Sequence, residues 1–239
     1  MGALAIDAVV CWKWTPARGF RSHFGASTVN VLRRMVARHY ARPHRFICVT
    51  DDPRGLDAAV EAIPLWREFA TLLSPWGPKQ PSCYRRLRAF AADVGQILGQ
   101  RFVSLDLDTV VVGDLVPLWE RPEDFVIWQN TTRRTTYNGS MFLLRAGTRT
   151  QVYDRFDPRV SPLRAKAAGQ FGSDQGWISY CLGRGQAVWT QRDGVYSYRN
   201  DLKSAAALPS DARIVFFHGA HDPWSPECQR LPWVRTHYQ

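Results

Sequence analysis

The chain has 239 residues, of which 45% are hydrophobic and 22% charged, proportions that are ordinary for a folded domain with a sizeable core. It contains no run of about eighteen apolar residues, which excludes a membrane-spanning helix. The formal net charge of +10 favours nucleic acid, an anionic membrane surface or phosphorylated small molecules as partners, although a solvated basic face without a specific partner is an equal alternative.

Two features predict a cytoplasmic location. The first residues, MGALAIDAVV, lack the basic start of a signal peptide and carry Asp7 within the apolar stretch, so we expect a strand there. The five cysteines are odd in number and widely scattered, without zinc or thioredoxin spacing. They are typical of reduced cysteines that pack as small hydrophobic residues.

The apolar periodicities predict alternating strands and helices. In chain order we expect a strand at 5–12, a helix at 25–40, strands at 45–50 and 60–64, a helix at 82–98 and a strand at 101–105. Further along we expect strands at 124–129, 140–144, 187–191 and 213–218, with helices at 148–156 and 173–182. This pattern indicates one α/β domain with a mixed, mostly parallel sheet flanked by helices.

Polar residues follow three of the predicted strands. Because ligands of open α/β sheets bind at the carboxyl ends of the strands, we expect one site along this edge. The residues that it would include are Trp12 and Lys13, Thr50 to Asp52, and Asp106-Leu107-Asp108.

The D-x-D segment suggests a cation. In an extended backbone Asp106 and Asp108 point to the same side, whereas Leu107 faces the core. Two neighbouring carboxylates repel each other and resist burial unless a cation lies between them, and Mg²⁺ commonly bridges carboxylates to phosphate oxygens. The simpler alternative is that one aspartate caps a turn.

His218 is a candidate third metal ligand, because it ends an apolar run and precedes the flexible Gly219. Two carboxylates and one imidazole suit Mn²⁺ somewhat better than Mg²⁺. The alternative is a histidine with a purely structural role.

Four segments, in this order, resemble the metal-dependent nucleotide-sugar glycosyltransferases of the GT-A fold. The likeness is to their retaining glycogenin and galactosyltransferase group, family eight. The segments are LDLDTVVVGDL at 105–115, YNGSMFLLRAG at 137–147, GSDQGWISYCL at 172–182 and HGAHDPW at 218–224, preceded by a weaker match, CYRRLRAF, at 83–90. The resemblance implies a single domain over 1–239, with a nucleotide-binding half at 1–115 and a sugar and acceptor half at 116–239.

The resemblance also implies roles for the matching residues. It implies that Asp106, Asp108 and His218 bind the metal. It also implies that Asn138, Asp174 and Gln175 contact the transferred sugar. The UDP-sugar donor would be bound by Trp12, Lys13, Thr50, Asp51, Arg86, Asp106, Leu107, Asp108, Gly219 and Trp224. Structural alternatives exist for three of them: the dipole of a helix start for Asp174, a turn for Asn138 and a solvated helix face for Arg86.

One position departs from the family pattern. The family carries a lysine two residues before the last tryptophan, where it neutralises the diphosphate, and this chain has Asp222 there. Either His221, Lys13 or one of Arg133 and Arg134 supplies that charge, or the donor is bound differently.

The resemblance thus implies transfer of a hexose from a UDP-sugar to an unknown acceptor, with Mn²⁺ or Mg²⁺ and with retention at the anomeric carbon. Asp174 would steady the cationic sugar or attack it directly. The alternatives are an inactive carbohydrate- or nucleic-acid-binding module and a nucleotidyltransferase. A nucleotidyltransferase would need a glycine-rich phosphate loop near the first strand, and the residues after that strand do not form one.

Overall fold

The computed structural model describes residues 4–15, 24–77, 80–132, 134–205, 207–219 and 221–239. Its centre is a seven-stranded sheet in the order β3-β2-β1-β4-β7-β6-β8. The strands are β1 (Ala8–Lys13), β2 (Arg45–Thr50), β3 (Glu61–Pro64), β4 (Arg101–Leu105), β6 (Phe125–Gln129), β7 (Tyr137–Arg145) and β8 (Ala187–Trp189). Only β7 runs against its neighbours, so the prediction of a mixed, mostly parallel sheet is confirmed.

A second, three-stranded sheet lies beside the first. It consists of β5 (Thr109–Val111), β10 (Ile214–Phe216) and β9 (Val195–Ser197), with β10 in the middle. Because β5 follows the D-x-D segment and β10 precedes His218, this small sheet joins two motifs that lie far apart in the sequence. It also links the two halves that the sequence divides at residue 115.

Alternating side chains of the central strands bury two separate hydrophobic cores, one on each face of the large sheet. Val9 and Cys11 face a core that contains α1 (Ala26–His39), α3 (Val116–Trp119), the small sheet and α7 (Pro232–His237). Val10 and Trp12 face the other core. That core contains the 3₁₀ helix η1 (Tyr84–Phe90), α2 (Gly95–Leu98), α4 (Gln151–Asp154), α5 (Ser161–Ala167) and α6 (Asp174–Leu182).

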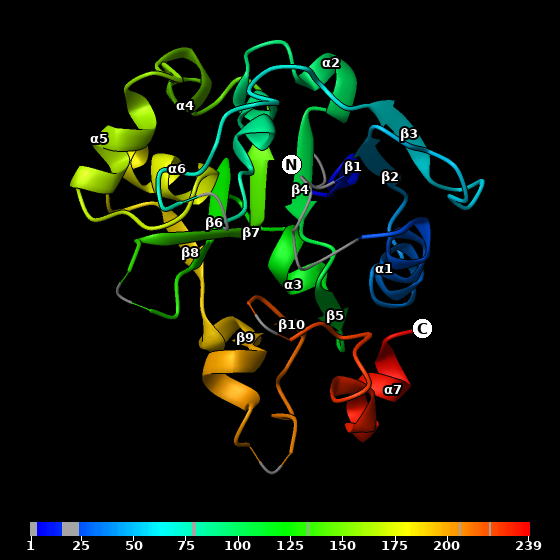
Figure 1. Cartoon of the computed structure of the whole chain (residues 1–239). Helices are drawn as coiled ribbons and strands as arrows, with labels where there is room; N and C mark the ends of the chain where they lie inside the picture. Colours follow the sequence, from blue (N-terminus) through cyan, green and yellow to red (C-terminus); the bar gives the residue numbers. More distant parts are fainter. Residues whose placement is uncertain (1–3, 16–23, 78–79, 133, 206, 220) are drawn as a thin grey trace.

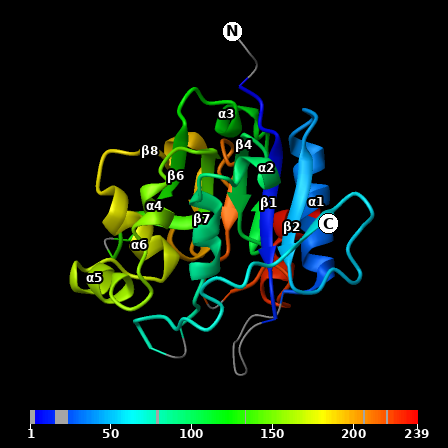
Figure 2. The same cartoon turned by 90° about the horizontal axis from the view of Figure 1, so that it is seen from above.

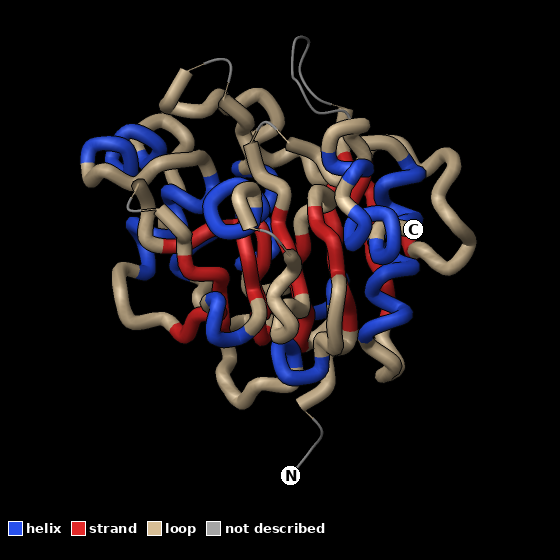
Figure 3. Tube along the Cα trace, turned by 90° about the horizontal axis from the view of Figure 1, so that it is seen from below, coloured by secondary structure: helices blue, strands red, loops and turns tan. Residues whose placement is uncertain are grey.

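The pictures show this layering directly. In Figure 1, α4, α5 and α6 lie on one side of the sheet and α1 on the other, with the small sheet and α7 below. Figure 2 shows α1 alongside β1 and β2 from above, and Figure 3 shows the strands enclosed by helices and loops. The arrangement is a single domain of three layers, and none of the helices in the described ranges is long and apolar enough to cross a bilayer.

The largest error of the sequence analysis is the helix expected over 82–98. The chain forms the 3₁₀ helix η1, leaves helical geometry at Ala91, whose backbone is extended, and resumes in the four residues of α2. The break places Arg88 beside Asp93, with two bonds of 2.6 and 2.7 Å between guanidinium and carboxylate. The strands β5 and β9 and the short helices α3, α5 and α7 were also not expected, because three to seven residues carry too little periodicity. The remaining short turns are η2 (Gln191–Asp193), η3 (Tyr198–Leu202) and η4 (Cys228–Arg230).

Candidate functional site

The carboxyl ends of β2, β1 and β4 form one edge of the large sheet. Lys13 and Thr50 are paired across the parallel strands β1 and β2, and β4 lies on the other side of β1. Lys13 and Thr50 are buried, and Leu107 is buried in the core as the alternation predicts. The three strand ends therefore lie side by side, as the sequence analysis expected.

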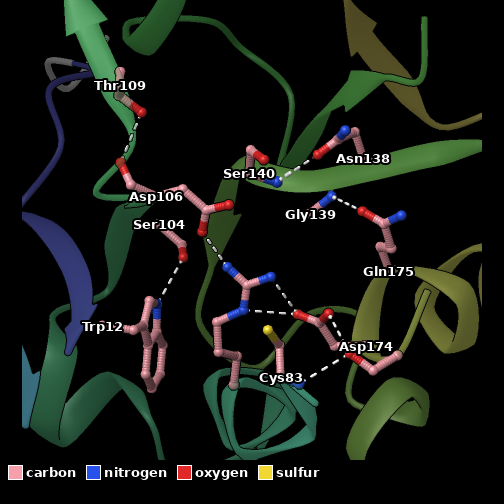
Figure 4. A network of polar contacts seen from close by, with 12 residues as sticks. Trp12, Cys83, Ser104, Asp106, Thr109, Asn138, Gly139, Ser140, Asp174 and Gln175 are labelled. Carbon is pink, nitrogen blue, oxygen red and sulfur yellow. Dashed lines mark hydrogen bonds and ion pairs between the residues drawn. The ribbon is translucent and has the colours of Figure 1, made fainter. Parts of the chain in front are cut away.

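Arg86 connects the D-x-D segment to the start of α6. Its Nε donates to Asp174 Oδ2 over 2.7 Å, its Nη2 lies 2.6 Å from the same oxygen, and its Nη1 donates to Asp106 Oδ1. Figure 4 shows the two aspartates pointing at one guanidinium. The Arg86 and Asp174 side chains are only 7% and 4% exposed, so this is a buried ion-pair triad rather than a solvated helix face.

Burial and charge act in opposite directions in this triad. Burial alone would lower the pKa of Arg86, but the charges of Asp106 and Asp174 outweigh it and raise that pKa well above its usual range. Burial raises the pKa of Asp174, and the Arg86 charge opposes that rise. The guanidinium is thus permanently charged, and it holds both carboxylates in fixed orientations.

Of the residues expected at the transferred sugar, Asp174 belongs to this triad and Gln175 follows it. Asp174 is the first residue of α6, and the next residue, Gln175, accepts through Oε1 from the Gly139 N–H over 3.3 Å. Asn138 is buried, and its Oδ1 accepts from the Ser140 N–H over 2.9 Å. A Cβ at Gly139 would lie 3.1 Å from Arg86 Nη2, so glycine permits β7 to approach the guanidinium. The structure thus brings Asp174 and Gln175 together beside Arg86, and Asn138 precedes Gly139 on β7 and bonds to Ser140 rather than to Arg86.

Asp108 and His218 lie on the small-sheet side of the same edge. The Phe217 N–H donates to the Asp108 carbonyl over 2.8 Å, which places His218 next to the D-x-D segment. Burial raises the pKa of Asp108 well above its usual range, and the charges of Asp106 and Asp222 add to that rise. Burial, followed by the charge of Arg199, lowers the pKa of His218 to about 4, so its imidazole is neutral at pH 7.

The donor set has the chemistry of a divalent-metal site. A neutral imidazole and neighbouring carboxylates are ligands for Mn²⁺ or Mg²⁺, and the repulsion that raises the pKa of Asp108 is of the kind that a cation relieves. Among the residues that the structure describes, no group of three or more His, Cys, Asp or Glu side chains is arranged as a complete metal-binding group. His218 Nε2 lies 2.7 Å from Ser197 Oγ, which leaves Nδ1 as its other ring nitrogen for coordination.

Three of the residues expected to bind the donor make contacts within the protein itself. The buried Trp12 indole donates to Ser104 Oγ over 2.9 Å, and the exposed Asp51 accepts from the Thr15 N–H over 2.9 Å. Trp224 packs edge-on against Phe24 with ring centroids 5.6 Å apart. Trp12 therefore presents little surface for stacking on a ligand, whereas the binding roles of Asp51 and Trp224 stay predictions.

The described residues that the sequence analysis expected to compensate for Asp222 include two with other contacts. His221 Nδ1 lies 3.4 Å from Glu227, and Arg134 lies over the Phe171 ring at 3.8 Å. Arg133 lies outside the described residues. The sequence analysis missed Arg199, whose guanidinium lies against Gly219, because Arg199 belongs to no motif. The neighbouring strand β9 has only three residues, too few for a periodic signal in the sequence.

No protein-family model and no curated protein matches the chain. Among solved structures, it is similar to the galactosyltransferase LgtC in complex with donor and acceptor sugar analogues, at 14% identity and a TM-score of 0.61, over 95% of this chain and 93% of that one. It is also similar to the glycosyltransferase GlyE of Streptococcus pneumoniae TIGR4, at 12% identity and a TM-score of 0.58, over 96% of this chain and 62% of that one. The bifunctional glycosyltransferase WbbM matches at 10% identity and a TM-score of 0.55, over 99% of this chain and 51% of that one. The chain thus has the fold of the GT-A glycosyltransferases over nearly its whole length.

Proposed function

We propose that this protein is a metal-dependent glycosyltransferase that moves a hexose from a UDP-sugar to an acceptor, with retention at the anomeric carbon. One observation carries the proposal: a buried arginine holds the D-x-D carboxylate of Asp106 and the carboxylate of Asp174 together at the carboxyl end of β4. A third element, β7, approaches the same guanidinium through Gly139, so three segments of the chain meet at this arginine. The fold neighbours are glycosyltransferases, which supports the same class.

The proposed site divides the work between two sets of residues. Asp106, Asp108 and His218 would hold Mn²⁺ or Mg²⁺, which stabilises the negative charge that develops on the leaving diphosphate. Arg86 would fix the positions of Asp106 and Asp174, and its charge opposes the rise in the pKa of Asp174 that burial causes. Asn138 and Gln175 offer amide groups to sugar hydroxyls.

Asp174 is the residue that we place beside the anomeric carbon. Its carboxylate would stabilise a cationic sugar while the acceptor attacks from the face that the diphosphate leaves. A double displacement with Asp174 as nucleophile gives the same stereochemistry. Because the Asp174 carboxylate is held tightly by Arg86, we favour the stabilising role.

The acceptor is proposed more broadly. A net charge of +10 favours an acceptor that carries phosphate or belongs to an anionic lipid surface. A catalytically inactive binding module and a nucleotidyltransferase remain the competing functions, and donor hydrolysis separates the first of them from an enzyme. A cytoplasmic location is likewise a prediction.

Calorimetric titration of UDP, GDP and ADP, each with and without Mn²⁺, tests the proposal. We expect Mn²⁺-dependent binding of UDP alone, followed by slow release of sugar when UDP-glucose and UDP-galactose are supplied. The matched control is Asp114→Asn, a half-exposed carboxylate in the same segment, against Asp108→Asn. The proposal would be contradicted if the unaltered protein binds no nucleotide, or if its UDP affinity is the same with and without Mn²⁺.

A further inference from the structure

The edge around His218 is rich in negative charge. The charges of Asp106 and Asp222 both act on Asp108, and the UDP-sugar of the proposed function would add a diphosphate to the same edge. A divalent cation balances only part of this charge, and enzymes that release a diphosphate use arginine or lysine beside the metal. The structure should therefore contain a side-chain cation that faces this edge.

Most nearby cations have other partners. Arg86 is held by two aspartates, and His221 lies beside Glu227. Arg134 lies over the Phe171 ring. Lys13 lies at the β1–β2 end of the edge, where its positive charge favours the ionised forms of Cys11 and Asp52. None of these four described residues supplies an uncommitted cation to the small-sheet end of the edge.

Arg199 is located at that end. A Cβ on Gly219 would lie 2.6 Å from Arg199 Nη1 and 3.4 Å from its Cζ, so the guanidinium rests against the glycine that follows His218. After burial, its positive charge is the second cause of the lowered pKa of His218. Arg199 is exposed, its Nε donates to Asn200 Oδ1 over 3.3 Å, and it forms no ion pair with any residue in the described part of the chain.

The turn that carries Arg199 is fixed to the same segment at several points. Arg199 lies in the π-helical turn η3, and such turns are frequent at functional sites. The preceding Ser197 contacts His218, and Tyr198 stacks on Phe217 with ring centroids 4.5 Å apart and planes at 13°. On the other side, Asn200 Nδ2 donates to Thr131 Oγ1 over 2.5 Å. The backbone of Arg199 is thus anchored on both sides while its side chain is free of carboxylates among the described residues.

We propose that Arg199 binds the diphosphate of the nucleotide-sugar donor and stabilises it as it leaves. This inference rests on the proposed function, and it assigns to Arg199 the charge that Asp222 does not provide. Gly219 has a φ of +95° and lacks a side chain, which leaves the guanidinium room to reach across the backbone beside His218. Arg199 can offer two parallel N–H groups to phosphate oxygens.

The test is calorimetric titration of UDP and of uridine, both with Mn²⁺, on Arg199→Gln, Arg199→Lys and the unaltered protein. The control is Arg192→Gln, an exposed arginine of the neighbouring turn η2. We expect Arg199→Gln to weaken UDP binding about 10- to 100-fold, in keeping with the loss of a charged hydrogen bond, and to leave uridine binding and the unfolding temperature unchanged. Arg199→Lys should recover part of the loss, and Arg192→Gln should behave as the unaltered protein.

Three results would overturn the inference. UDP binding by Arg199→Gln equal to that of the unaltered protein would show that Arg199 does not touch the diphosphate. An equal loss of UDP and uridine binding would show that Arg199 acts only through the structure. If the unaltered protein binds no nucleotide at all, both this inference and the proposed function fail, which distinguishes that case from the other two.

Discussion

The two ends of the candidate site differ in how completely their charges are paired. At the end that we propose for the sugar, called the sugar end below, Arg86 lies between Asp106 and Asp174, buried and bonded to both. At the end that we propose for the diphosphate, called the diphosphate end below, Asp108 is close to other carboxylates, and a low pKa keeps His218 neutral at pH 7. The sugar end is therefore organised in advance, whereas the diphosphate end depends on charges that a donor and a metal would bring.

Breaking the sugar end should have the largest effect. Arg86→Met leaves Asp174 buried without its partner, so we expect the free energy of unfolding to fall by about 3–5 kcal/mol in urea titrations. Adding Asp174→Leu to Arg86→Met should recover part of the loss, because the unpaired charge is then gone. Arg54→Met, which removes an exposed pair with Asp52, should change stability little. Equal losses for the two single variants would refute the distinction between the ends.

At the diphosphate end the main effect should be on binding. Asp108→Asn removes a proposed metal ligand, so Mn²⁺-dependent UDP affinity should fall by about 100-fold or more. The pKa of Asp108 is raised by burial and by Asp106 and Asp222, so the charged form is disfavoured in the folded state and the variant should be at least as stable at pH 8. Calorimetry and urea titration measure the two quantities. Unchanged UDP affinity would remove Asp108 from the metal site.

The buried imidazole predicts a smaller effect that depends on pH. The pKa of His218 falls from 6.5 to about 4 on folding, so the stability that it contributes is complete above pH 6.5 and is lost as the pH falls towards 4. At pH 5 the loss is about 2 kcal/mol. Urea titrations at pH 7 and pH 5 measure how far the free energy of unfolding falls between the two pH values, and this fall should be smaller in His218→Gln. An identical fall in both proteins would contradict the prediction.

The smallest effect concerns the surface as a whole rather than either end. With a net charge of +10, the protein should sediment with vesicles that contain phosphatidylserine, or bind DNA, at low ionic strength, and should release both near physiological salt. Vesicles of phosphatidylcholine alone serve as the control. Absence of binding to both polyanions at low salt would leave the basic charge without a polyanionic partner.

Contiguous motifs allowed much of the fold to be predicted from the sequence. The strands at 45–50 and 101–105 have the predicted bounds, because each is a short, mostly apolar segment that begins at an arginine and ends before polar residues. The helix at 82–98 was wrong, because no local signal reveals that the chain becomes extended at Ala91. Periodicity indicates which face of an element is buried and does not show where the backbone leaves helical geometry.

Within the candidate site, the residues of each motif could be named but not their pairing. Asp106 and Asp174 were expected at the metal and at the sugar, respectively, yet Arg86 joins them from positions 20 and 88 residues away. Arg199 was missed because its relation to Gly219 exists only after β9 and β10 have paired. Contacts of this kind depend on sheet topology, which one sequence specifies only indirectly.

The pairing of β5 with β10 also fixes the order in which the site can be built. During synthesis the D-x-D segment leaves the ribosome roughly a hundred residues before His218 does, since chains emerge from the N-terminus onwards. Until β10 arrives, β5 lacks its neighbour in the small sheet, and the edge holds its aspartates without the histidine. A nascent chain is consequently unable to assemble the diphosphate end until nearly all of these residues have been made, so the proposed transfer chemistry would begin only in the finished fold.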